Sequence, residues 1–190
     1  SSQWEHFHRI VRVPDIFDCA KAHGLTTGSV FWPVTGCHPH VDWLIDEYWP
    51  QNNGQDEAEC FREAGTNEET MEVVYRNIHL VRGRLRSHPW SDEFINACAC
   101  DMIRRFRPNL TMLHLGNVDG YRHEKGVFSA KVTHGLHECD LWLGDILQAL
   151  DVAGIREQTN VFVVSDHGQI DVQGSVHPNV LLCRAGLIHL

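Results

Sequence analysis

A strand–helix–strand pattern fills the second half of the chain and limits the fold more than any other feature. Residues 110–115 (LTMLHL) and 161–164 (VFVV) are short apolar runs typical of buried strands. Between them, residues 128–153 place leucines along one side of a long helix, and Gly154 is suited to end it. Such a unit is expected to be right-handed with parallel strands. It predicts an α/β fold with a mostly parallel sheet and helices on both faces.

The first half of the chain fits the same fold class. Periodicity and end signals predict further elements, listed here as helices at 14–23, 68–85 and 91–106, a strand at 26–32, and one or two helical turns at 41–48. Ser91 is the predicted N-cap of the third of these helices. We expect residues 1–190 to form a single α/β domain, incomplete at both ends, because the chain opens without Met and stops inside an apolar run.

Charge and composition argue against several functions. The chain has 190 residues and a net charge of −9, with no run of Lys and Arg, which disfavours binding to a nucleic-acid polymer. It has no apolar stretch of 18 residues, so no membrane span is expected. Its seven cysteines are odd in number and irregularly spaced, which favours reduced thiols and a cytoplasmic location.

Two motifs follow the two strand-like runs. Asp119 and His123 are four residues apart after the first run, so one helical turn would turn both side chains the same way. Asp166 and His167 follow the second run directly, and Gly168 permits the tight turn that they need. Carboxylate and imidazole groups at strand ends are suited to zinc or manganese. Two such pairs at one end of a parallel sheet predict a two-metal site.

The motif residues also have simpler interpretations. Asp119 and Asp166 could cap helices, with His123 and His167 as surface residues, in a non-catalytic α/β domain. His38 and His40 flank Pro39 without a carboxylate at helical spacing, so no metal role is expected for them. Core packing rather than base stacking is expected for three tryptophans, Trp32, Trp43 and Trp49.

Taken together, the motifs resemble the metal-binding core of the alkaline phosphatase superfamily, and most closely its type I phosphodiesterase/nucleotide pyrophosphatase branch. The resemblance rests on the two motifs and the helix between them. It extends to residues 16–24 followed by 29–33 (SVFWP), and to 179–182 (NVLL) with 185–188 (AGLI). It therefore spans nearly the whole chain.

The resemblance implies a two-metal hydrolase of phosphate diesters or nucleotide pyrophosphates. Its cofactors would be two divalent ions, zinc first and manganese as the alternative, and its substrate a small phosphate ester or nucleotide. Asp119 and His123 would match two ligands of one ion, and Asp166 and His167 two ligands of the other. The family's serine or threonine nucleophile would lie upstream of Ser1, so this chain alone is expected to be inactive.

Some positions depart from the family pattern or leave the activity open. A first Asp ligand would lie before Ser1 and a last His ligand after Leu190. The segment around Thr35 superficially resembles the one that follows the family's nucleophile, and His177 superficially matches the last His ligand. The neighbours of both residues fit other parts of the pattern, so neither is assigned. The alternative activity is that of another superfamily member: a phosphomonoesterase, a sulfatase or a phosphonate hydrolase.

Overall fold

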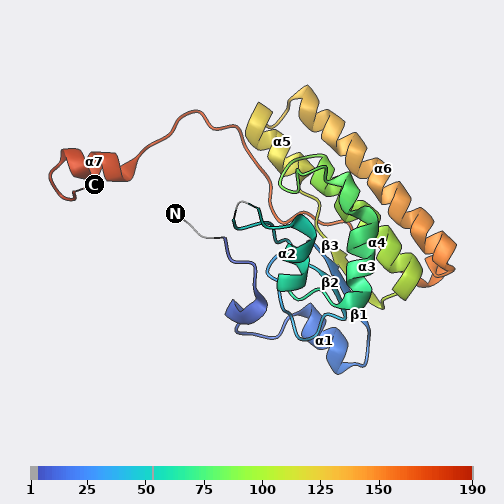
Figure 1. Ribbon diagram of the computed structural model, residues 1–190. Helices are drawn as coiled ribbons and strands as arrows, with labels where there is room; N and C mark the ends of the chain where they lie inside the picture. Colours follow the sequence, from blue (N-terminus) through green and yellow to red (C-terminus); the bar gives the residue numbers. More distant parts are fainter. Residues whose placement is uncertain (1–3, 53, 190) are drawn as a thin grey trace.

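The computed structural model describes residues 4–52 and 54–189 (Figure 1). In chain order its elements are η1 (His8–Ile10), α1 (Ile16–Ala22), β1 (Thr27–Val30), β2 (Trp43–Ile45), α2 (Glu57–Glu63), α3 (Glu68–Asn77), η2 (Ile78–Leu80), α4 (Trp90–Phe106), β3 (Leu110–Leu113), α5 (Asn117–Lys125), α6 (Ala130–Ala153), η3 (Arg156–Gln158) and α7 (Pro178–Arg184). The predicted α/β class is confirmed.

The sheet of the described residues is parallel, with the strand order β2-β1-β3. Gly28 of β1 pairs with Trp43 on one side and with Thr111 on the other. The prediction of helical turns at 41–48 is wrong, because this segment supplies β2. Pairing with β1 overrides the local sequence pattern: the side chains of Leu44 and Ile45 are buried, and the Asp42 carboxylate accepts a hydrogen bond from Thr27 N at the start of the strand.

The two faces of the sheet are covered differently. Helices α3 and α4 cover one face, where Val30, Phe61, Phe94 and Met102 belong to the main hydrophobic core. On the opposite face Ser29 Oγ lies 3.1 Å from Thr35 Oγ1, and Thr27 Oγ1 donates to the carbonyl of His40. The loop that follows β1 therefore covers this face, and α1 contacts β1 as well.

Two helices begin at local side-chain caps, whereas α4 does not begin at its predicted cap. Helix α1 begins after Asp15, whose carboxylate accepts hydrogen bonds from Phe17 N and Asp18 N in a capping box. Helix α6 begins after Ser129 and ends at Gly154, whose φ of 72° suits glycine. The N-cap prediction at Ser91 is wrong: α4 begins at Trp90, and the Ser91 hydroxyl donates to the Ser87 carbonyl of the preceding turn.

Helix α6 packs along α4 on the side away from the sheet (Figure 1). Ala149, Leu150 and Ala153 of α6 form a second apolar cluster with Cys100 and Ile103 of α4. Helix α5 lies beside the first half of α6. The layers are therefore sheet, then α3 and α4, then α6 with α5 at its end, as Figure 1 shows.

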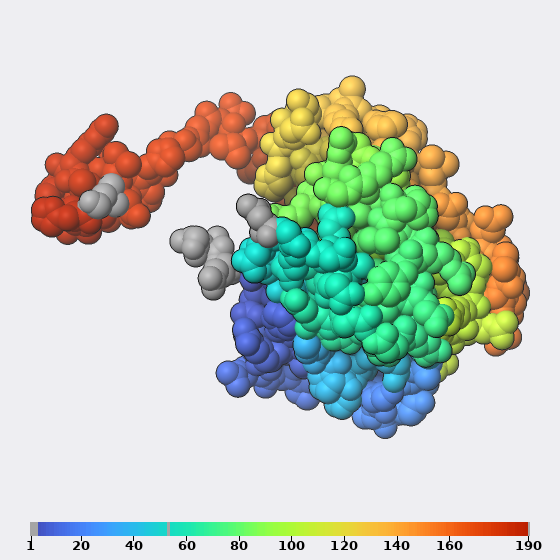
Figure 2. Space-filling model, viewed as in Figure 1, coloured from blue at the N-terminus to red at the C-terminus, as the bar shows by residue number. Residues whose placement is uncertain are grey.

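The predicted strand at 161–164 is wrong. Phe162, Val163 and Val164 are 84%, 76% and 75% exposed, and this segment pairs with no other strand of the described residues. A buried strand needs both a paired neighbour and covering layers, and residues 161–164 have neither in the described part of the chain. The strand–helix–strand unit is therefore incomplete, because its second strand is not formed. Beyond Asp171, the chain extends away from the packed helices and sheet, and α7 lies at some distance from them (Figures 1 and 2).

Candidate functional site

Helix α5 starts directly after the carboxyl end of β3, at the position where parallel sheets place functional groups. Asp119 lies in its first turn, and His123 follows one turn later. Their side chains face the same way, as predicted, with Nε2 of His123 3.5 Å from Oδ2 of Asp119. The first motif therefore forms a carboxylate–imidazole pair on one helix surface.

The second motif reaches the same surface. His167 Nε2 lies 3.9 Å from Oδ1 of Asp119 and 3.4 Å from Oδ2 of Asp166. Two further contacts hold this segment in place: Gln169 Nε2 donates to Oδ1 of Asp119 in α5 at 3.0 Å, and Val127 N, in the loop after α5, donates to Asp171 Oδ1 at 3.0 Å. The four residues predicted from the sequence are thus neighbours, although the strand expected to bring Asp166 and His167 there is not formed.

The chemistry of this group suits a divalent cation. Two carboxylates and two imidazoles are the hard-to-borderline donors that zinc and manganese bind. The four side chains, listed as Asp119, His123, Asp166 and His167, are between 46% and 72% exposed. Because the donor atoms are accessible from solvent, an ion could reach them without any change in the core.

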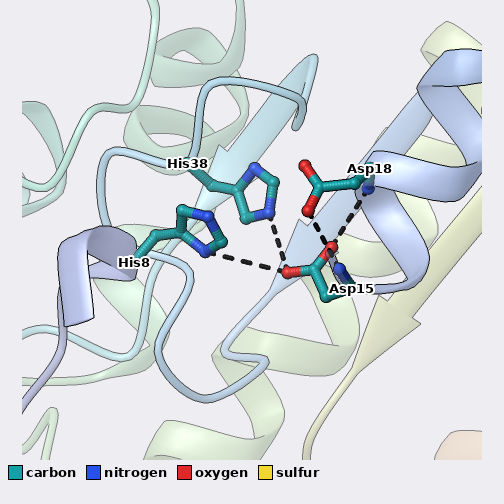
Figure 3. A group of neighbouring side chains, drawn as sticks. All are labelled: His8, Asp15, Asp18 and His38. Atoms are coloured by element: carbon teal, nitrogen blue, oxygen red, sulfur yellow. Dashed lines mark hydrogen bonds and ion pairs between the residues drawn. The ribbon is translucent and has the colours of Figure 1, made fainter. Parts of the chain in front are cut away.

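A second group of possible ligands lies elsewhere and was not predicted from the sequence. His8, Asp15, Asp18 and His38 each offer one donor atom, and these four atoms lie within 4.8 Å of one another (Figure 3). They come from η1, from the start of α1 and from the loop after β1. His38 is 23 residues from Asp15, so neither helical nor strand periodicity could have shown this pairing.

Hydrogen bonds account for the close approach of Asp15 and His38 in this second group. Asp15 Oδ2 lies 2.9 Å from His38 Nε2, and His38 Nδ1 accepts from His40 N. Since Nδ1 accepts, the ring proton of a neutral His38 lies on Nε2 and is donated to Asp15. Burial lowers the pKa of His38 despite the opposing effect of Asp15, which favours that neutral form. A metal would have to replace the proton on Nε2.

The remaining contacts join the loop after β1 to the N-terminal segment and to α1. The rings of His8 and His38 are 3.8 Å apart, and His40 Nδ1 lies 2.6 Å from Asp18 Oδ1. His38 and His40 therefore do have carboxylate partners, which tertiary packing supplies rather than helical spacing. The residue types of this group suit a metal-binding site. Its geometry is that of a hydrogen-bonded cluster that holds the N-terminal segment, α1 and the loop after β1 together.

Other residues considered from the sequence have packing or local roles. Trp43 stacks on Phe106 with ring centres 4.8 Å apart, as expected for a core residue. Thr35 is buried and donates to the Trp32 carbonyl. His177 lies in the exposed C-terminal segment, with Ser175 Oγ 3.4 Å from its Nε2. None of these three side chains takes part in the contacts of Asp119 described above.

Comparison with known proteins settles the family. The family model described as "Type I phosphodiesterase / nucleotide pyrophosphatase" matches residues 1–190. The chain belongs to this family. Searches of the curated proteins and of the solved structures found no match.

Membership in the type I phosphodiesterase/nucleotide pyrophosphatase family supports a hydrolase of this type, and the family implies small phosphate esters as substrates. The family is generally metal-dependent, and this chain contains candidate metal-binding side chains. Among residues 4–52 and 54–189, no helix combines the length and apolar character needed to cross a membrane.

Proposed function

We propose that this chain contributes two metal half-sites to a two-metal hydrolase of phosphate diesters or nucleotide pyrophosphates. Asp119 and His123 would bind one divalent ion, and Asp166 and His167 the other. Zinc is the proposed metal and manganese the alternative. The observation that carries the proposal is that His167 Nε2 lies within 4 Å of both Asp119 and Asp166, which belong to different motifs.

The chain's own residues hold and orient the site. Bound ions would polarise the phosphoryl oxygens of a substrate and compensate their negative charge. Asp119 and Asp166 supply the anionic charge that retains the ions, and the two histidines supply neutral nitrogen donors. Gln169 donates to Asp119 Oδ1, so this carboxylate keeps Oδ2 for an ion on the side of His123.

Several further parts of the proposal rest on the family resemblance or on the cysteines. The nucleophile would be a serine or threonine upstream of Ser1, so the chain by itself would hydrolyse little. Residues 1–190 would form part of one catalytic-core domain. The proposed compartment is the cytoplasm, which the free thiols of all seven cysteines favour.

A Zn²⁺ titration followed by the NMR signals of the histidine rings tests the metal sites one by one. We expect the His123 and His167 signals to respond first. The variants Asp119→Asn and Asp166→Asn should weaken Zn²⁺ binding at least tenfold. His134→Gln is the matched control, because His134 is an exposed histidine that also faces a carboxylate, that of Glu138. The titration uses the longest natural form of the protein that carries this chain, and if the His123 and His167 signals do not respond to Zn²⁺ there, the non-catalytic interpretation replaces this one.

The reaction type needs a separate experiment, on the longest natural form of the protein that carries this chain. Hydrolysis of bis(p-nitrophenyl) phosphate is compared with that of p-nitrophenyl phosphate and p-nitrophenyl sulfate. We expect the diester to react fastest. A preference for the monoester or the sulfate would instead support the phosphomonoesterase or sulfatase alternative.

A further inference from the structure

The first turn of α5 depends on a buried carboxylate of α4. Asp92 is 0% exposed, and its Oδ1 accepts hydrogen bonds from Gly116 N at 2.7 Å and Asn117 N at 3.1 Å. These amides lie at the start of α5, where the helix has no internal partners for its N–H groups. A carboxylate in this position is also stabilised by the helix dipole. Asp92 therefore fixes where α5 begins.

The other oxygen of Asp92 binds a histidine that lies against the same turn. His88 Nδ1 is 2.5 Å from Asp92 Oδ2. The His88 ring is so close to α5 that a Cβ added at Gly120 would lie 2.5 Å from its Cδ2 atom. Burial lowers the pKa of His88, but the hydrogen bond and charge of Asp92 and the smaller effects of the Asp119 and Glu138 charges together raise it, which favours an imidazolium paired with Asp92.

The opposite side of α5 is held by α6. Asn117 Nδ2 donates to the Gly135 carbonyl and to Glu138 Oε2, both at 3.1 Å, and Tyr121 OH donates to the same Glu138 oxygen at 3.0 Å. Asn117 and Tyr121 are buried. With Asp92 on one side and Glu138 on the other, the rotation of α5 about its axis is defined.

That rotation decides which way Asp119 and His123 face. Asp119 lies two residues after Asn117 and directly before Gly120, so it belongs to the turn that Asp92 and His88 hold. A small rotation of α5 would turn Asp119 away from His167, which is 3.9 Å from it. Metal ligands tolerate little displacement, because their distances from the ion are nearly fixed.

We propose that Asp92 and His88 are positioning residues of the Asp119–His123 half-site, an inference that rests on the function proposed above. They touch neither ion nor substrate. They hold the first turn of α5 so that the two ligands meet those of the second motif.

The test is the same site-resolved Zn²⁺ titration, applied to His88→Ala and Asp92→Ala. We expect each variant to weaken Zn²⁺ binding at His123 at least tenfold and to shift the backbone amide signals of α5. The conservative variant Asp92→Asn should restore most of the affinity, since an amide oxygen can still accept from Gly116 N and Asn117 N. Asp101→Ala is the matched control: Asp101 is an α4 aspartate that binds Asn77 and Arg104 instead of α5.

The outcomes separate this inference from the proposed function. If Asp119→Asn weakens Zn²⁺ binding while folded His88→Ala and Asp92→Ala bind as the unchanged chain does, the positioning role is refuted. If Asp119→Asn itself has no effect, the proposed function is refuted first. Should Asp92→Ala fail to fold, His88→Ala decides, because the His88 side chain is partly exposed and its loss leaves both α5 amides bonded to Asp92.

Discussion

At the scale of single residues, Asp46 has a strongly raised pKa. It is 0% exposed at the carboxyl end of β2, and burial raises its pKa to about 7. Thr35 Oγ1 lies 2.8 Å from the Trp32 carbonyl and 3.0 Å from Asp46 Oδ1. Because the hydroxyl has a single hydrogen and the carbonyl can only accept, a protonated Asp46 donating to Thr35 would satisfy both contacts.

This raised pKa predicts that the chain loses stability as the pH rises. In the unfolded chain Asp46 releases its proton near pH 4, whereas in the folded chain it keeps the proton up to about pH 7. The contribution to the free energy of unfolding is therefore complete below pH 4 and is lost between pH 4 and 7, by about 4 kcal/mol at most. Urea denaturation across this range measures it.

Asp46→Asn should flatten part of this decline, because an amide resembles the protonated acid and does not titrate. Glu47, whose pKa burial also raises to about 7, would keep the rest of the pH dependence. Asp151→Asn is the control, since Asp151 is an exposed residue near the end of α6. Parallel curves for Asp46→Asn and the unchanged chain would show that Asp46 is ionised in the folded state.

At the scale of elements, the contact between α5 and α6 depends on a glycine. A Cβ at Gly135 would lie 2.7 Å from Cδ2 of Tyr121, which is 2% exposed and has no space to move into. Gly135→Ala should therefore destabilise the chain by about 1–3 kcal/mol despite the better helix propensity of alanine. Gly144→Ala, on the same helix with nothing within 4 Å, should instead stabilise it by up to about 1 kcal/mol. Urea denaturation measures both, and equal effects would contradict close packing at Gly135.

The elements also show what periodicity can and cannot predict. The stripe of leucines over residues 128–153 predicted α6 nearly to its ends, because helix patterns and caps are local. The Asp119–His123 pairing followed from helical spacing for the same reason. Strand β2 and the exposed run at 161–164 were assigned wrongly, because a strand depends on a partner that periodicity does not reveal. The group around His8 and His38 was missed because its members meet only through tertiary packing.

At the scale of the whole molecule, the C-terminal segment separates into a part that touches the body and a part that does not. Residues 165–171 contact α5 through His167 and Gln169, and the loop after α5 through Asp171. Farther on, Val172 and Val176 are 81% and 74% exposed, and α7 has no buried residue. Figure 2 shows the end of the chain projecting from the body. The second motif, Asp166 and His167, is thus held by a few polar contacts rather than by a core.

Two shortened chains test this division. A chain that ends after Asp171 keeps every contact with α5 and should bind Zn²⁺ and unfold as the full chain does, within about 0.5 kcal/mol. A chain that ends after Asn160 loses Asp166 and His167, so its Zn²⁺ affinity should fall at least tenfold while its free energy of unfolding changes little. Urea denaturation and the Zn²⁺ titration measure the two quantities separately. A loss of several kcal/mol on removing residues 161–171 would mean that the apolar run at 161–164 is buried in solution, as the sequence pattern alone suggested.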